Sequence, residues 1–268
     1  GSAENSSKFL NQIIEFDEGT LTPTNFVQST SNAVAGILAV MGKKTGYNNT
    51  HINQGLAFEA ALLDALMLFE EGKSKQLLLG GGEEMYTSIY NIDEQQDAYK
   101  DEAIDASDLL TAETKGTLPG EGVTMFVIDE QQHDDSITEV VDVDMISTVD
   151  QSEVLNKLNH FLTKNNLTAG DIDTVLMGRN GDQGTDFFYS FIEKDLFPNQ
   201  SIIVYKHLVG EYYTSPAFAL WLVSSMLNGE QLPASCYWKS SDVKPKNILL
   251  YNHYNGNQHG FILLKSVK

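Results

Sequence analysis

Residues 45–84 read TGYNNTHINQGLAFEAALLDALMLFEEGKSKQLLLGGGEE, and their order decides the fold class. From residue 56 to residue 69 the apolar side chains are interrupted only by Glu59 and Asp64. At 100° per residue these two side chains project about 140° apart, so the stretch predicts a helix that is covered on most sides. Residues 75–82 then predict a short strand that is buried on both faces.

The polar segment before this helix ends in Asn53, Gln54 and Gly55. A catalytic nucleophile is often held at such a place, because the N-terminus of a helix stabilises an anion. An amide or a glycine cannot act as that nucleophile. The stretch therefore predicts the layout of a catalytic site without its usual reactive group.

Composition limits the classes of protein and partner. The chain of 268 residues is 41% hydrophobic and has six prolines, which allows a substantial core in one large domain or two fused halves. A formal net charge of −20 argues against nucleic acid and anionic membrane surfaces as partners, since binding either normally needs clustered Lys and Arg. We recognise no membrane span and no signal peptide, so the expected location is the cytoplasm.

The first half of the chain divides by composition. Residues 1–20 are polar and carry no buried-strand signal, and Gly1-Ser2 is typical of a cloning scar. After Thr22-Pro23 an apolar stretch to residue 41 predicts a helix. Residues 91–118 predict an exposed acidic excursion, residues 120–128 a strand and residues 129–135 a linker. We therefore expect an N-terminal segment (1–20), a first half (21–130) and a second half (131–268).

The second half repeats the order of the first. The patterns predict an amphipathic helix at 155–163, a strand at 172–177 that runs into a polar loop, a strand at 201–205, a mostly apolar helix at 215–227, and late strands at 248–250 and 261–264. Two mostly buried helices, each in a half that ends in a strand, predict a layered α/β fold built by duplication.

The sequence lacks the usual motifs for nucleotide binding, for hydrolases and for metalloproteases. Residues 80–82 are three glycines without the spacing or the Lys-Ser/Thr of a nucleotide loop, so they predict close backbone packing. There is no G-x-S-x-G elbow and no H-E-x-x-H. The six histidines are scattered and the only cysteine, Cys236, has no activating neighbour in sequence, so we predict neither a metal site, a cofactor nor a disulfide, and expect Cys236 to be a packed residue.

Six segments lie in a fixed order and spacing. Residues 22–36 carry P-x-x-F, S-x-x-N and A-G patterns, residues 72–82 a helix end, a strand and a G-G turn, and residues 120–128 a G-E-G strand. Residues 175–186, 205–211 and 251–257 follow in the second half. This order resembles the β-ketoacyl synthase family of the thiolase superfamily, in which the last three places read A-H-G-T-G-T, T-K-S-x-x-G-H and N-S-F-G-F-G-G. The resemblance implies a thiolase-like layered αβαβα fold with two duplicated halves and buried central helices.

A synthase of this family holds a cysteine at the start of the buried helix, where the helix N-terminus and two histidines favour thiolate and stabilise an oxyanion. The resemblance places the cysteine at Gln54, or at Gly55 if the helix end is aligned without a gap. It places the histidines at Gly178 and Glu211 and keeps the lysine as Lys206. A carboxylate opposes a developing oxyanion, so the resemblance predicts no intact catalytic centre.

Glutamine in place of the cysteine resembles the chain-length factors, the non-catalytic partners of ketosynthases in polyketide and aryl-polyene type biosynthesis. The opening segment is most similar to proteins of aryl-polyene and flexirubin clusters. The resemblance implies a heterodimer with an active ketosynthase and a role in shaping the tunnel for the growing chain. Acyl carrier protein is acidic, so we expect the partner to bind it. Two departures are a missing first strand and helix before Thr22, and a rewritten closing loop at residues 254–258.

Three alternatives stay open. The chain could be a divergent 3-oxoacyl-acyl-carrier-protein synthase or decarboxylase-type relative, with His51 or His207 recruited as donors beside Gln54 and with Asn53 in the pocket. It could be a homodimeric acyl-binding protein. Gln54 could also only satisfy a loop after catalysis was lost. An enzyme needs donors that converge near Gln54, whereas a partner subunit needs an apolar dimer face beside residues 48–54.

Overall fold

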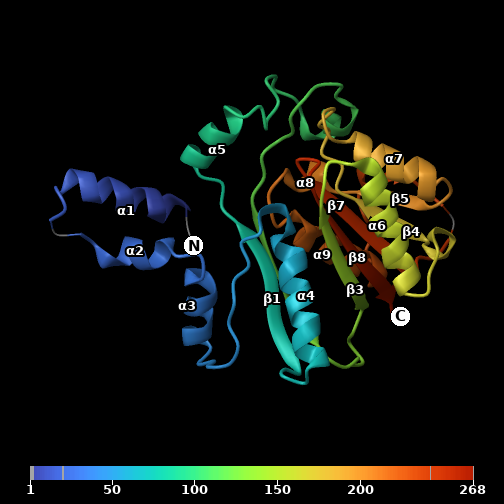
Figure 1. Cartoon of the computed structure of the whole chain (residues 1–268), viewed down its shortest axis with the longest axis horizontal. Helices are drawn as coiled ribbons and strands as arrows, with labels where there is room; N and C mark the ends of the chain where they lie inside the picture. Colours follow the sequence, from blue (N-terminus) through green and yellow to red (C-terminus); the bar gives the residue numbers. More distant parts are fainter. Residues whose placement is uncertain (1–2, 20, 242, 268) are drawn as a thin grey trace.

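Two sheets of different size organise the chain, whose computed structural model describes residues 3–19, 21–241 and 243–267 (Figure 1). The small sheet pairs β1 (Gln76–Glu83) antiparallel with β2 (Gly122–Asp129). The large sheet has the order β3-β8-β7-β4-β5-β6. Its strands are β3 (Thr138–Ser147), β4 (Thr174–Met177), β5 (Ser201–Val204), β6 (Tyr237–Lys239), β7 (Asn247–Tyr254) and β8 (Gln258–Ser266).

Two apolar helices lie between the sheets. α4 (Ala57–Glu70) and α9 (Ser215–Leu227) share one hydrophobic cluster with β1 on one side and with β7 and β8 on the other. α6 (Gln151–Lys164) and α7 (Phe187–Leu196) cover the opposite face of the large sheet with a second cluster. The thiolase-like α/β fold expected from the resemblance is confirmed, and both central helices lie where the hydrophobic patterns predicted them.

The outer face of the small sheet is exposed, and the prediction that its first strand is buried on both faces was wrong. Leu78 of β1 and Val127 of β2 are direct cross-strand partners, and they are 60% and 64% exposed. Val123 and Met125 extend the same apolar face along β2. The sequence run looked doubly buried because both faces of β1 are apolar, but only α4 and α9 cover the strand, from one side.

The first three helices form an arm that projects from the sheets (Figure 1). α1 (Ala3–Glu15) occupies the segment that we described only as polar, and the single helix expected up to residue 41 is two helices, α2 (Pro23–Ser29) and α3 (Ala33–Met41). Hydroxyl groups compete for the backbone at the break: Ser29 Oγ donates to Phe26 O and Thr30 Oγ1 to Val27 O. Neither α2 nor α3 has a buried residue.

Several elements differ from the sequence prediction. β3 and α7 were not predicted, and β7 and β8 are longer than expected. The acidic excursion contains the end of α5 (Thr87–Glu94) and is not exposed throughout, since Leu109 in the 3-10 helix η2 (Ala106–Thr111) is fully buried. The remaining short helices are α8 (Lys206–Val209), η1 (Gln54–Leu56), η3 (Ala169–Asp171) and η4 (Ala234–Cys236). No helix in the described part of the chain is long and apolar enough to span a membrane. The division into halves at residues 130 and 131 stays a prediction.

Candidate functional site

The start of α4 is held against the turn between β7 and β8. The backbone N–H of Gly55 donates to Gln258 Oε1 at 3.1 Å. A Cβ atom on Gly55 would lie 2.1 Å from Cβ of Tyr254, so this position accepts no side chain without movement of the turn. Gln54 and Asn53 are exposed, and Gln54 has φ = 53°, which is unusual for a residue with a Cβ atom. Gln54 thus has an unusual backbone conformation, and the N–H of Gly55, the alternative position of the nucleophile, already has an acceptor.

The position of the first expected histidine is closed by neighbouring side chains. A Cβ atom on Gly178 would lie 2.1 Å from Asn252 Oδ1 and 2.8 Å from the hydroxyl oxygen of Tyr189. Both neighbours are buried, on β7 and α7. An imidazole at Gly178 therefore needs a rearrangement of this corner.

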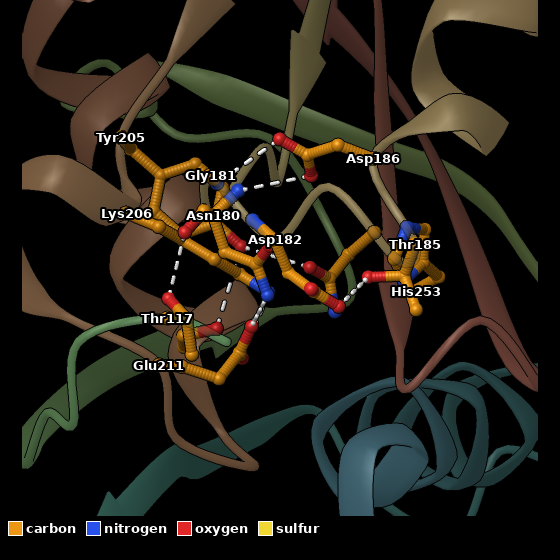
Figure 2. Close-up of polar contacts among 12 residues, drawn as sticks. Thr117, Asn180, Gly181, Asp182, Thr185, Asp186, Tyr205, Lys206, Glu211 and His253 are labelled. Carbon is orange, nitrogen blue, oxygen red and sulfur yellow. Dashed lines mark hydrogen bonds and ion pairs between the residues drawn. The ribbon is translucent and has the colours of Figure 1, made fainter. Parts of the chain in front are cut away.

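The position of the second expected histidine holds a buried ion pair. Figure 2 shows Lys206 and Asn180 converging on Glu211. Lys206 Nζ lies 2.8 and 2.6 Å from the two carboxylate oxygens of Glu211, and Asn180 Nδ2 donates to Glu211 Oε2 at 2.7 Å. Lys206 is completely buried, and Glu211 is the counter-charge that pairs with it. Glu211 accepts three short hydrogen bonds and offers no donor to an oxyanion.

The polar loop after β4 is tied to the acidic excursion. Asp186 Oδ1 and Oδ2 accept the backbone N–H groups of Asn180 and Gly181, and burial raises the pKa of Asp186 to about 6 against the lowering effect of these donors. Asp182 accepts from Gly116 N at 2.9 Å, and Thr117 Oγ1 donates to Asn180 O at 2.7 Å (Figure 2). These bonds fix the loop beside the Lys206–Glu211 pair.

The two histidines considered as recruited donors have other partners. His51 Nε2 lies 3.0 Å from Asp64 Oδ2 of α4, which also accepts from Tyr47 at 2.7 Å. His207 Nε2 lies 3.0 Å from Ser235 Oγ. No hydrogen bond or ring contact described in the structure links either imidazole to Gln54. The arrangement gives no support to an enzyme that uses them.

Two other histidines are buried behind the loop, and the sequence analysis gave them no role. His253 of β7 and His259 of β8 are direct cross-strand partners with ring centroids 5.7 Å apart. Burial holds the pKa of His253 well below its usual value and lowers that of His259 to about 4. Tyr251 and Tyr189 pack against these rings. Both imidazoles are thus neutral members of an aromatic core. The available signal was that each lies within two residues of an apolar run, residues 248–251 and 261–264.

Glu59 is a buried acid in the first turn of α4. It is completely buried, and its carboxyl oxygens have no hydrogen-bond partner on another residue. Burial raises its pKa to about 8, although the charge of Lys206 acts in the opposite direction. Glu59 packs against Gly260 of β8. The sequence showed two acids, Glu59 and Asp64, on an apolar helix but did not show which of them is buried. Asp64 lies near the surface.

A cavity of about 230 Å³ lies next to the Lys206–Glu211 pair. Its walls come from the end of β1, α5 and the acidic excursion on one side, and from the loop after β4 and the turn after β7 on the other. Glu211 and Asn180 contribute to its lining. Among the described residues no group of three His, Cys, Asp or Glu side chains could hold a metal ion.

The layered fold is that of thiolase-like ketosynthases. Residues 1–162 match the family described as Beta-ketoacyl synthase, N-terminal domain. Because this match covers more than half of the chain, the protein belongs to that family.

Solved structures share the fold at low sequence identity. The ishigamide ketosynthase/chain length factor has a TM-score of 0.80 at 12% identity, over 100% of this chain and 73% of the other. A β-ketoacyl synthase from Burkholderia phymatum STM815 has a TM-score of 0.77 at 18% identity, with the same coverage. A ketosynthase in complex with its chain length factor from Xenorhabdus doucetiae has a TM-score of 0.77 at 12% identity, over 98% of this chain and 71% of the other. No curated protein matches the chain.

Proposed function

We propose that this protein is a non-catalytic ketosynthase-like subunit that pairs with an active ketosynthase, in the manner of a chain length factor. The observation that carries the proposal is the state of the catalytic positions. Gln54 has no nucleophile to offer, and Glu211 uses both oxygens to hold Lys206. A ketosynthase needs a thiolate and imidazole donors at these places. In this proposal the protein keeps the ketosynthase fold and lacks the nucleophile and imidazole donors that the ketosynthase reaction needs.

The surroundings of Gly178 and Gly55 also support a non-catalytic role. Asn252 fills the space beside Gly178, and Gln258 accepts the N–H of Gly55 that would otherwise be free to bind an oxyanion. Restoring a cysteine alone at Gln54 would leave it without an imidazole and without this donor. The divergent-synthase alternative is accordingly disfavoured.

An apolar, uncharged surface supports pairing with another subunit. Residues 19–42 contain no charged side chain, although the whole chain carries −20. Val34, Val40 and Met41 of α3 are exposed, and so is Ile52 in the extended segment before α4. Exposed apolar surface of this extent is typical of an interface, and the lack of charge avoids repulsion by the partner. Ile52 itself lies in residues 48–54, the segment beside which we expected a dimer face.

Co-expression tests this proposal. The chain is produced together with a catalytically active ketosynthase from the same organism, purified through a tag on one subunit, and incubated with acyl and malonyl thioesters of acyl carrier protein. We expect a stable one-to-one complex, and intact-protein mass spectrometry should find the acyl adduct on the ketosynthase only. An adduct on this chain, or malonyl decarboxylation by this chain alone above background, contradicts the proposal. A stable homodimer that excludes the ketosynthase would favour the acyl-binding alternative.

A further inference from the structure

The arm formed by α1, α2 and α3 is not anchored by the hydrophobic core. No described residue before Phe58 belongs to either hydrophobic cluster. α3 contacts mainly α2, and neither helix has a buried residue. The apolar side chains of α3 that we assign to pairing thus lie on a part of the chain that projects from the sheets (Figure 1). A surface that moves relative to the body must be ordered when a partner binds, which lowers the affinity.

Residues 47–51 connect this arm to α4 through their side chains. Tyr47 Oη donates to Asp64 Oδ2 at 2.7 Å, and His51 Nε2 lies 3.0 Å from the same oxygen. Asn48 Nδ2 donates to Ala35 O of α3 at 2.9 Å. One carboxylate on the central helix therefore holds both ends of the segment, and the segment in turn holds α3.

The main chain of this segment adds no anchor of its own. Residues 45–52 take part in none of the backbone–backbone hydrogen bonds of the described chain. The backbone N–H of Thr50 donates to Asn49 Oδ1, which is a local bond that reaches neither helix. Ordering the backbone of each residue costs conformational entropy. The contacts with Asp64 and Ala35 have to offset that cost.

Asp64 is suited to this task because it is charged and lies on a rigid element. The buried side chains of α4 belong to the first hydrophobic cluster. Burial raises the pKa of Asp64, but the hydrogen bonds from Tyr47 and His51 outweigh burial, so this pKa lies below its usual value. Hydrogen bonds to a charged acceptor are stronger than those between neutral groups. The side chain of Asp64 is 27% exposed, so solvent weakens these bonds only in part.

We propose that Asp64 is a positioning residue for subunit pairing. By holding residues 47–51 against α4, it fixes the direction of α3 through Asn48. The exposed apolar side chains of α3 and of Ile52 then meet the ketosynthase in one arrangement. This inference rests on the pairing proposed above and explains how the surface is prepared before the partner binds.

Hydrogen–deuterium exchange of the chain alone tests the positioning step. Asp64→Ala removes the acceptor and favours the helix, and we expect amide exchange in α3 to become about threefold faster or more. Exchange in β7 and β8 should stay unchanged, because these strands belong to the core. Glu70→Ala removes the same charge from an exposed residue of the same helix and should leave α3 as in the wild type. Unchanged exchange in α3 of Asp64→Ala, or faster exchange throughout the chain, would overturn the proposal.

Binding to the ketosynthase tests the consequence for pairing. We expect the dissociation constant to rise about tenfold for Asp64→Ala and less than twofold for Glu70→Ala, measured by biolayer interferometry with the ketosynthase of the co-expression test. Tyr47→Phe, which keeps the ring of an exposed residue, should weaken binding by a smaller factor. Combined with Asp64→Ala it should add no further loss, because the hydrogen bond is already absent. Losses that multiply in the double variant would show that the two residues act separately and would contradict the proposal.

The result for the wild type separates this inference from the pairing itself. A wild-type chain that forms no complex would refute the pairing and, with it, the role of Asp64 in pairing. A complex that Asp64→Ala forms as tightly as the wild type would refute the positioning role alone.

Discussion

Gln54 keeps a backbone conformation that its side chain does not favour, with φ = 53° at the position of the expected nucleophile. A residue with a Cβ atom pays about 1–2 kcal/mol in this region, which glycine does not. We therefore expect Gln54→Gly to raise the free energy of unfolding by roughly 0.5–1 kcal/mol, after the entropy that glycine adds to the unfolded chain. Urea denaturation followed by circular dichroism measures this change.

The neighbouring residue provides the control for this prediction. Asn53 has φ = −83°, which all residues adopt readily. Asn53→Gly should lower the free energy of unfolding by about 0.5–1 kcal/mol, because only the entropy term remains. A stabilisation in both variants, or in neither, would show that backbone strain at Gln54 is not the cause.

The buried pair of Lys206 and Glu211 should behave as one unit. Glu211→Gln leaves the ammonium of Lys206 buried without a counter-charge, since the side chain of Lys206 is 0% exposed. We expect a loss of about 3–5 kcal/mol in the free energy of unfolding. The double variant Lys206→Met with Glu211→Leu should lose less than Lys206→Met or Glu211→Leu alone, because no charge remains buried. Additive losses in a double-mutant cycle would contradict this coupling.

Glu59 should make stability depend on pH. Its pKa is about 8 in the folded protein and has the ordinary value of 4.5 in the unfolded chain. Between these pH values the folded chain therefore binds more protons than the unfolded chain. The free energy of unfolding therefore falls as pH rises through this window, by roughly 5 kcal/mol at most for this group alone. Glu59→Gln, which stays neutral, should remove that part of the dependence.

Urea denaturation at pH 6.5 and at pH 8 measures the effect of Glu59 above the range in which buried histidines titrate. The variant should gain stability relative to the wild type as pH rises. A constant difference between the two proteins across this range would contradict a neutral Glu59. Asp64→Asn is the control, because the pKa of Asp64 is lowered and its carboxylate is charged throughout the range, although burial acts against this.

At the scale of elements, α3 is the best place to test the interface. Val40 of α3 and Val149, which lies between β3 and α6, are 79% and 76% exposed. Val40→Asp should reduce the yield of the ketosynthase complex about tenfold or more, since a charge would enter an apolar interface. Val149→Asp makes the same change at a similar exposure in the segment between β3 and α6, elements that lie away from the arm (Figure 1), and we expect no loss of complex. Equal losses would place the interface elsewhere.

The sequence predicted best the two central helices, which are covered by the core on most sides. α9 has the same bounds as its prediction, and α4 differs by one residue at each end, because their apolar residues pack between two sheets. β3 was missed although Asp142 and Asp144 alternate with apolar residues, a pattern typical of a half-buried strand. The ion-pair partners of these two residues, Lys164 and Lys157, come from α6. These ion pairs depend on tertiary contacts that no local pattern encodes.

The candidate site was predictable only in part for the same reason. The absence of a nucleophile at Gln54 follows from the residue type alone. The closure of Gly178 by Asn252 and the use of the Gly55 N–H by Gln258 depend on side chains that lie far away in sequence. The cavity likewise joins β1 and α5 to the turn after β7. Such contacts become visible only when the two parts of the fold are brought together.

On the scale of the whole molecule, charge decides where an acyl carrier protein can bind. The chain carries −20, and the acidic excursion forms part of one wall of the cavity beside Glu211. An acidic carrier protein is repelled by such a surface. Under the proposed pairing, the basic surface that it needs comes from the ketosynthase.

Salt dependence distinguishes this division of labour from weak binding by both subunits. We expect labelled carrier protein to bind the complex, with an affinity that falls about tenfold between roughly 50 and 300 mM NaCl as attraction to basic residues is screened. The chain alone should bind at least tenfold more weakly at low salt, and screening should not weaken that residual binding further, because its electrostatic part is repulsive. Fluorescence anisotropy measures both. An affinity of the isolated chain that also falls with salt would mean that it has a basic docking site of its own, and the carrier would then have two entrances to the complex instead of one.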